Sequence, residues 1–150
     1  MNQPFALAEF VTESNRIEGL GPATPGELLA HEDFLSQPIS VVSLARFVAT
    51  VADAELRMHP GMDVRVGRHF PPRGGEGIVA ALKGLLADII EWKVASYEAH
   101  QRYETLHPFM DGNGRSGRAL WLWQMGGIER APLGFLHHFY YQSLDAKRVP

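Results

Sequence analysis

Helical periodicity interrupted by glycine and proline is the feature that most constrains the fold of this chain. Apolar residues recur three or four positions apart along most of the sequence, which is the spacing of one face of an α-helix. The pattern predicts helices over 4–18, 24–35, 40–58, 76–106, 115–125 and 132–144. The fold class that it indicates is all-α.

The ends of these helices carry signals of their own. Gly19 follows the first periodic segment and can end it in the left-handed conformation. Thr24 and Glu27 form a capping-box pattern, with proline at the first helical position between them, and this predicts a helix start. The segment 76–106 is interpreted as one long helix or as two helices that meet near Glu91–Lys93.

The segment 62–75 breaks the helical pattern. Valine alternates there with a charged or a small residue, at Val64, Arg65, Val66 and Gly67, before two prolines and two glycines. Such alternation next to proline is typical of a short extended edge or a hairpin. We therefore expect a helical core with a small β-hairpin flap. An ordinary edge strand, kept soluble by Arg65, Arg68 and Pro71, is the alternative interpretation.

Composition limits the classes of protein to consider. The 150 residues, 45% of them hydrophobic and 21% charged, suffice for a single domain, which we expect to span 1–150. A net charge of −3 argues against a general nucleic-acid scaffold and against a polybasic membrane binder. No apolar run reaches the roughly 18 residues of a membrane span, and we find no export signal. Because cysteine is absent, disulfides and thiolate chemistry are excluded. We expect a cytoplasmic protein with neither membrane nor nucleic acid as its partner.

The densest group of chemically active residues lies in LHPFMDGNGRSGR, residues 106–118. Gly112, Asn113 and Gly114 form a turn at the start of a helix, where glycine has no Cβ to keep an anion away from the backbone N–H groups. The positive end of the helix adds to this attraction. A di- or triphosphate is therefore the expected occupant of the turn.

Four side chains beside the turn complete a candidate nucleotide site. Arg115 and Arg118 lie three residues apart, on roughly one helical face, so their guanidinium groups can hold phosphates together. Asp111 can bind Mg²⁺, which takes oxygen ligands and bridges phosphates. His107 ends the preceding helix and has a pKa suited to removing a hydroxyl proton. A Gly-rich turn alone is most often a tight connection, but the joint occurrence of these residues favours the functional interpretation.

HPFMDGNGRSGR, residues 107–118, resembles the signature of the Fic family, His-Pro-Phe-x-Asp/Glu-Gly-Asn-Gly-Arg-x-x-Arg, at every specified position. YEAHQRYETL, upstream of it, resembles the helix that precedes that signature. The resemblance implies a helical Fic fold with a β-hairpin flap over the active site. It also implies transfer of AMP from ATP to a hydroxyl side chain of a target protein.

The same resemblance implies a role for each site residue. His107 would be the base that deprotonates a Ser, Thr or Tyr of the target, and Asp111 would hold Mg²⁺ on the phosphates. The turn 112–114 would form the anion hole. Arg115 would steady the leaving pyrophosphate, and Arg118 would grip the γ-phosphate.

SNRIEG, residues 14–19, resembles the inhibitory-helix motif of this family, Ser/Thr-x-x-x-Glu-Gly/Asn. The resemblance implies an inhibitory helix over 4–19, in which Glu18 pairs with Arg118 and crowds out the γ-phosphate. Taken without the family signature, Ser14 and Glu18 are simply residues i and i+4 at the end of a helix.

Two further assignments come from the resemblance. The segment 62–75 would be the flap, and an extended piece of the target would pair through main-chain hydrogen bonds with the part made of Val64, Arg65, Val66, Gly67 and Arg68. Tyr141 would line the adenine base; a position in the core is the alternative with equal support.

The expected function is that of an autoinhibited protein adenylyltransferase that uses ATP and Mg²⁺ and acts on a protein bearing a hydroxyl side chain. Self-association into a homo-oligomer stays open. The alternatives are removal of AMP with Glu18 positioning a water, transfer of the γ-phosphate, and a catalytically quiet module that senses ATP or binds a partner. Phosphate transfer goes with Lys in place of the second motif glycine, so Gly114 argues against it, and His107 argues against the quiet module.

Overall fold

The computed structural model describes residues 3–127 of the chain. Its helices, in chain order, are α1 (Gln3–Ile17), α2 (Pro25–Leu35), α3 (Val41–Ala52), α4 (Glu76–Ile90), α5 (Ser96–Leu106) and α6 (Asn113–Gln124). The mainly helical prediction is confirmed. The helix predicted over 132–144, and with it Tyr141, lies outside the described residues.

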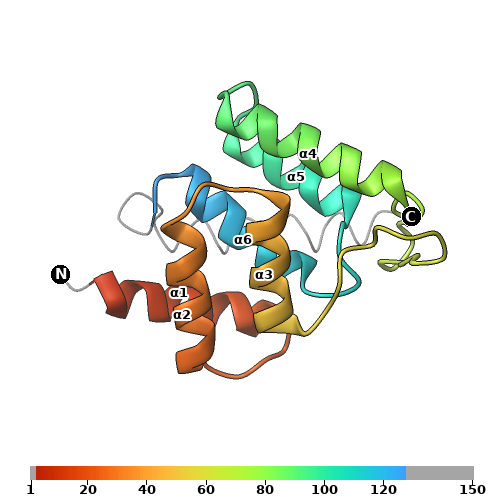
Figure 1. Ribbon diagram of the computed structural model, residues 1–150. Helices are drawn as coiled ribbons and strands as arrows, with labels where there is room; N and C mark the ends of the chain where they lie inside the picture. Colours follow the sequence, from red (N-terminus) through yellow and green to blue (C-terminus); the bar gives the residue numbers. More distant parts are fainter. Residues whose placement is uncertain (1–2, 128–150) are drawn as a thin grey trace.

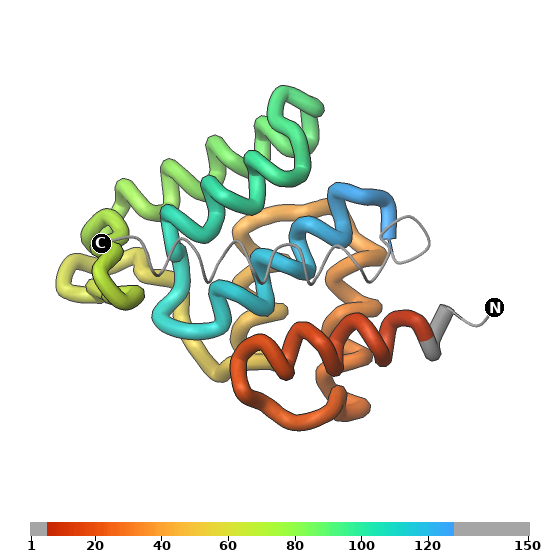
Figure 2. The backbone as a smooth tube through the Cα atoms, turned by 180° about the vertical axis from the view of Figure 1, so that it is seen from behind, coloured from red at the N-terminus to blue at the C-terminus, as the bar shows by residue number. Residues whose placement is uncertain are grey.

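Helix α6 is central to the arrangement (Figures 1 and 2). It packs against α1, α2, α3 and α5, while α4 and α5 lie side by side and run in opposite directions. Most of the α6 side chains are buried, as is expected of a helix enclosed on several sides. The N-terminal end of α6 lies beside the loop that follows α5.

The predicted helix boundaries are confirmed where a capping residue marks them. Thr24 and Glu27 exchange hydrogen bonds of 2.8 and 3.2 Å between side chain and backbone, and α2 begins between them. Gly19 follows α1 with φ = 73°. The two interpretations of 76–106 resolve in favour of two helices, because Trp92 takes φ = 56° in the turn between α4 and α5.

Helix α3 is shorter than the sequence predicts. Periodicity indicates a helix over 40–58, but α3 ends at Ala52, and Asp53 takes the left-handed conformation with φ = 49°. The chain then extends, and Leu56 forms an antiparallel bridge with Phe109. Pairing with a distant segment therefore overrides the helical periodicity of the sequence.

We call residues 62–75 the flap segment. It is not helical, in agreement with prediction, but the predicted hairpin of two strands is not shown. One antiparallel bridge joins Val66 to His69 through N–H···O bonds of 3.0 and 2.8 Å. Proline at positions 71 and 72 offers no N–H to a ladder, which limits pairing beyond this bridge. The guanidinium of Arg65 lies 5.0 Å from the ring centroid of the exposed Phe70.

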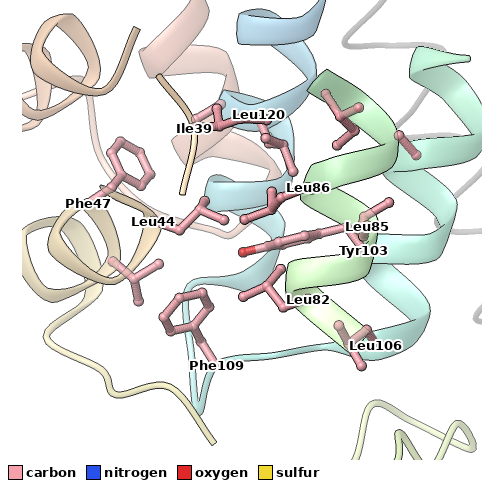
Figure 3. Close-up of a cluster of buried hydrophobic side chains, with 14 of the residues drawn as sticks. Ile39, Leu44, Phe47, Leu82, Leu85, Leu86, Tyr103, Leu106, Phe109 and Leu120 are labelled. Atoms are coloured by element: carbon pink, nitrogen blue, oxygen red, sulfur yellow. The ribbon is translucent and has the colours of Figure 1, made fainter. Parts of the chain in front are cut away.

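Two clusters of buried apolar side chains hold the helices together. The larger one joins α2, α3, α4, α5 and α6 with the loops before α3 and after α5. Ten of its members are labelled in Figure 3: Ile39, Leu44, Phe47, Leu82, Leu85, Leu86, Tyr103, Leu106, Phe109 and Leu120. The smaller one fastens α1 to α6 through Leu7, Phe10, Val11, Trp121 and Leu122. Within it the rings of Phe10 and Trp121 stack with their centroids 6.4 Å apart. This contact joins the middle of α1 to the C-terminal half of α6.

None of the helices within residues 3–127 has the length and the apolar character that crossing a membrane requires.

Candidate active site

The N-terminus of α6 is open to an anion. Gly112 precedes the helix with φ = 77°, and no side chain caps the helix start. The N–H groups of Asn113, Gly114 and Arg115 have no hydrogen-bond partner among residues 3–127, whereas Ser116 donates to the Gly112 carbonyl at 2.9 Å. Three unpaired backbone donors at the positive end of a helix can bind phosphate oxygens.

The Asn113 side chain holds this turn in place from inside. Its Oδ1 accepts from the N–H of Phe109 at 2.9 Å, and its Nδ2 donates to the carbonyl of the same residue at 2.8 Å. Phe109 is itself fully buried in the larger cluster (Figure 3). The amide of Asn113 therefore shapes the loop, and only its backbone N–H is available to an anion.

His107 follows α5 directly and has φ = 50°. Its Nδ1 lies 2.9 Å from the carbonyl oxygen of Glu104. Because a carbonyl can only accept, Nδ1 carries the proton and Nε2 of the neutral ring is the acceptor. This is the tautomer that a general base requires.

A cleft of about 530 Å³ brings the expected site residues together. This volume lies within the range typical of small-molecule sites, roughly 300–1,000 Å³. Its lining includes His107, Asp111, Gly112, Asn113, Gly114, Arg115, Arg118, Glu18, Val64, Arg65 and Val66. Ser14 reaches the site through Arg118, while Gly67 and Arg68 of the flap segment do not line the cleft.

The two arginines of the motif are engaged differently. Arg118, 7% exposed, donates from Nε to Oγ of Ser14 at 2.8 Å, and from Nη2 to the Ser14 carbonyl at 3.0 Å and to Oε1 of Glu18 at 3.1 Å. Arg115 donates from Nη1 to the carbonyl of Val51 at 2.6 Å, and its buried Nε has no partner among residues 3–127. Arg118 is thus held by the end of α1, and Arg115 by the end of α3.

The carboxylate of Glu18 lies against the start of α6. A Cβ added to Gly114 would come within 2.5 Å of Oε1 of Glu18, so only glycine leaves room for this approach. The end of α1 is tied down further by Asn15, whose Nδ2 donates to both carboxylate oxygens of Glu27 and to the carbonyl of Gly21, each at 3.2 Å. The in-chain carboxylate therefore lies where a phosphate is expected.

Among residues 3–127, the positive charge behind the turn comes from arginine side chains. Burial lowers the pKa of His31 to about 4, although a 2.7 Å contact of Nδ1 with the Glu27 carbonyl opposes the shift. Burial also lowers the pKa of His100. Both histidines are therefore neutral near pH 7, and the arginines that line the cleft are Arg65 on the flap segment and Arg115 and Arg118 on α6.

Asp111 is an exposed carboxylate in the cleft, and its Oδ1 accepts from the N–H of Gly112 at 2.7 Å. Within residues 3–127, no group of three or more His, Asp or Glu side chains could hold a metal ion. A single carboxylate fits Mg²⁺, which commonly takes one or two protein carboxylates and completes its shell with phosphate oxygens and water.

Sequence reasoning missed several residues of this region. Leu20, Glu104 and Met110 line the cleft but stand at no specified position of a motif. Arg57 is completely buried next to the loop 107–112, which we call the His107 loop. The periodicity of 40–58 wrongly places Arg57 on a helix. No signal in the sequence singles out these four positions, because their roles arise from tertiary placement.

No curated protein matches the chain. Members of the Fic/DOC family typically transfer nucleotide or phosphate groups to proteins. The sequence model of the Fic/DOC family matches residues 62–125 of this chain. The matched segment contains the flap segment, α4, α5, the loop that carries His107, and α6.

Proposed function

We propose that this chain is an autoinhibited protein adenylyltransferase that transfers AMP from ATP to a Ser, Thr or Tyr hydroxyl of a target protein. One observation carries the proposal: His107 and the residues with unpaired N–H groups at the start of α6 line the same cleft. Asp111, Arg115 and Arg118 add the charges that a nucleotide and its metal ion need.

The proposed reaction is a displacement at the α-phosphorus of ATP. The hydroxyl oxygen of the target forms a bond to this phosphorus as the bond to the oxygen that bridges to the β-phosphate breaks. The hydroxyl proton passes to Nε2 of His107, and pyrophosphate leaves with the electron pair of the broken bond. The backbone N–H groups of Asn113, Gly114 and Arg115 and the side chain of Arg115 meet the negative charge of the phosphates. Mg²⁺, which Asp111 would hold, supplies further positive charge to the phosphate oxygens.

Inhibition follows from the contacts at the end of α1. Glu18 pairs with Arg118 and lies against Gly114, so its carboxylate takes the space and the cation that the γ-phosphate would use. ATP must then displace Glu18 before its triphosphate can lie fully extended. We expect low basal activity and activation by any event that moves Glu18 away.

The flap segment is suited to holding the target. Val64 and Val66 line the cleft, and the backbone N–H and C=O groups of Val64 and Arg65 have no partner among residues 3–127. An extended peptide can pair with such a free edge through main-chain bonds. Gly67 and Arg68 form the turn between the bridge partners Val66 and His69, and they would contact the target through their exposed surfaces.

Removal of AMP is a second candidate, because Glu18 reaches the cleft and its carboxylate could position a water. Transfer of the γ-phosphate has less support, because that activity goes with a lysine at the position that Gly114 occupies in this chain. The test incubates the Glu18→Gly variant with ATP labelled at the α- or the γ-phosphate, with His107→Ala in the same background and His59→Ala as the control. Label incorporated from the α-phosphate alone, lost in His107→Ala and kept in His59→Ala, supports adenylylation. Incorporation from the γ-phosphate alone, or from neither, contradicts it.

A further inference from the structure

Arg57 is a buried cation whose partners are backbone carbonyls. Its side chain is 0% exposed and forms no ion pair within residues 3–127. Four of the five guanidinium N–H groups donate to carbonyl oxygens: Nε to His107 at 2.6 Å, Nη2 to Leu106 at 2.9 Å, and Nη1 to Met62 at 3.0 Å and Pro72 at 2.8 Å. Burial lowers the pKa of Arg57, but the ordinary value is so high that the group stays charged.

Two of these carbonyls belong to the C-terminal end of α5, where a helix leaves carbonyl groups without intrahelical partners and favours a cation. Every carbonyl from 103 to 108 has a partner there. The carbonyl of Tyr103 accepts from the His107 N–H, that of Glu104 from His107 Nδ1, and that of Thr105 from His69 Nε2. The carbonyls of Leu106, His107 and Pro108 accept from Arg57, through its Nη2, its Nε and its backbone N–H respectively. Arg57 thus supplies three of the six donors. These bonds surround His107, where the backbone takes the left-handed conformation and whose side chain lines the cleft.

The other two carbonyls belong to the flap segment, at Met62 near its beginning and Pro72 near its end. His69, at the bridge of the flap segment, also reaches α5, since its Nε2 lies 2.9 Å from the Thr105 carbonyl. One planar guanidinium therefore bonds both to the segment that would hold the target and to the loop that carries the base. Lysine could not replace it, because an ammonium is a compact charge with three donors and lacks this fork.

We propose that Arg57 is a positioning residue that sets the distance and orientation between the flap segment and His107. A target segment paired with the flap then presents its hydroxyl to Nε2 at a fixed geometry. This inference rests on the proposed function, because it assumes a target on the flap and a base at His107. It assigns no contact of Arg57 with nucleotide or target.

The experiment compares Arg57→Lys and Arg57→Met with a matched control, Arg46→Met, which removes an exposed arginine of α3. All are made in the Glu18→Gly background and checked for folding by thermal melts. A misplacement of about 1 Å can lower a rate about 100-fold. We expect kcat for AMP transfer to fall about 10- to 100-fold in both Arg57 variants, while the Kd of a non-hydrolysable Mg-ATP analogue changes less than about 2-fold.

Two readouts separate positioning from mere stabilisation. The imidazole ¹⁵N signals of His107 should show one tautomer, with the proton on Nδ1, in the parent and in Arg46→Met, and a mixture of tautomers in Arg57→Lys. A folded Arg57→Lys variant with unchanged kcat and an unchanged His107 tautomer overturns the proposal. So does a fall of nucleotide affinity in parallel with kcat, which would indicate general loosening of the site.

The unmodified chain provides the remaining measurement. The Nε–H proton of Arg57 should exchange with solvent much more slowly than that of Arg46, because it is buried and donates to the His107 carbonyl. Equal exchange rates contradict the inference even if neither Arg57 variant folds. If Glu18→Gly transfers no AMP at all, the proposed function fails, and the tautomer and exchange data still decide whether Arg57 positions the histidine.

Discussion

Arg118 and Glu18, which are 100 positions apart in the chain, meet at 3.1 Å in the cleft. Their exposure is unequal: the Arg118 side chain is 7% exposed and that of Glu18 is 37% exposed. Arg118 is also held by two bonds to Ser14, whereas the Glu18 side chain is partly exposed to solvent. The carboxylate is therefore the partner that can move away, and the guanidinium is the partner that is held in place.

Replacing Glu18 should release the site. In the proposed function, Glu18→Gly removes a carboxylate that competes with the γ-phosphate, and such a coupling is worth on the order of 1–3 kcal/mol. We expect ATP affinity and the rate of AMP transfer to rise by about 5- to 150-fold, measured by titration calorimetry and by label incorporation. Glu13→Gln is the matched control, because it removes the carboxylate that pairs with the exposed Arg16 on the same helix. An unchanged ATP affinity together with an unchanged rate at sub-saturating Mg-ATP would show that Glu18 is not inhibitory.

Replacing Ser14 should have a smaller effect in the same direction. Ser14→Ala removes the hydroxyl that accepts from Nε of Arg118 but keeps the carbonyl that accepts from Nη2. The loss of one hydrogen bond to a charged group, about 1.5–3 kcal/mol at most, loosens α1 without removing Glu18. The rate of AMP transfer should lie between those of the parent chain and Glu18→Gly. A rate above that of Glu18→Gly would mean that Ser14 acts on Arg118 in some other way.

His31 should make the folded state sensitive to acid. Its pKa is lowered from 6.5 to about 4 by burial, so the unfolded chain binds a proton between these values and the folded chain does not. Stability is then fully present above pH 6.5 and is lost as the pH falls toward 4, by about 2 kcal/mol between pH 7.5 and pH 5. Urea unfolding at the two pH values measures the loss, and His31→Gln should remove most of it. An equal loss in the variant would assign the acid sensitivity to other groups.

Gly112 should tolerate no side chain. Its φ is 77°, and an added Cβ would come within 2.6 Å of the Ala52 Cβ. Gly112→Ala should lower the free energy of unfolding by at least about 1 kcal/mol from the left-handed backbone alone, and it should weaken ATP binding. The control Gly77→Ala lies in α4 with no atom within 4 Å of its added Cβ, and it should stabilise the helix slightly. Equal stabilities for the two variants, measured by urea unfolding, would contradict this account of the turn.

The sequence predicts well what depends on local chemistry. The capping box of Thr24 and Glu27, the left-handed Gly19 and the helix after the turn at Gly112 all appear in the structure. These features are decided by residues within four positions of one another, so a sequence pattern suffices to find them. The encounter of Glu18 with Arg118 was expected only through the resemblance to a family, because spacing alone cannot bring together residues so far apart.

Tertiary placement decides the features that the sequence leaves open. The stretch after Ala52 has helical periodicity, yet it extends to pair Leu56 with Phe109 and to bury Arg57. The four carbonyls that surround the Arg57 guanidinium come from three separate parts of the chain, and backbone carbonyls leave no mark on a sequence.

The most direct test is a crystal structure of the Glu18→Gly chain with Mg²⁺ and a non-hydrolysable ATP analogue. We predict that the triphosphate lies across the turn 112–114, that Arg118 contacts its γ-phosphate, and that Nε2 of His107 faces the α-phosphorus. An empty turn in a crystal that holds the nucleotide elsewhere, or a His107 ring directed into the protein interior, would contradict the proposed function.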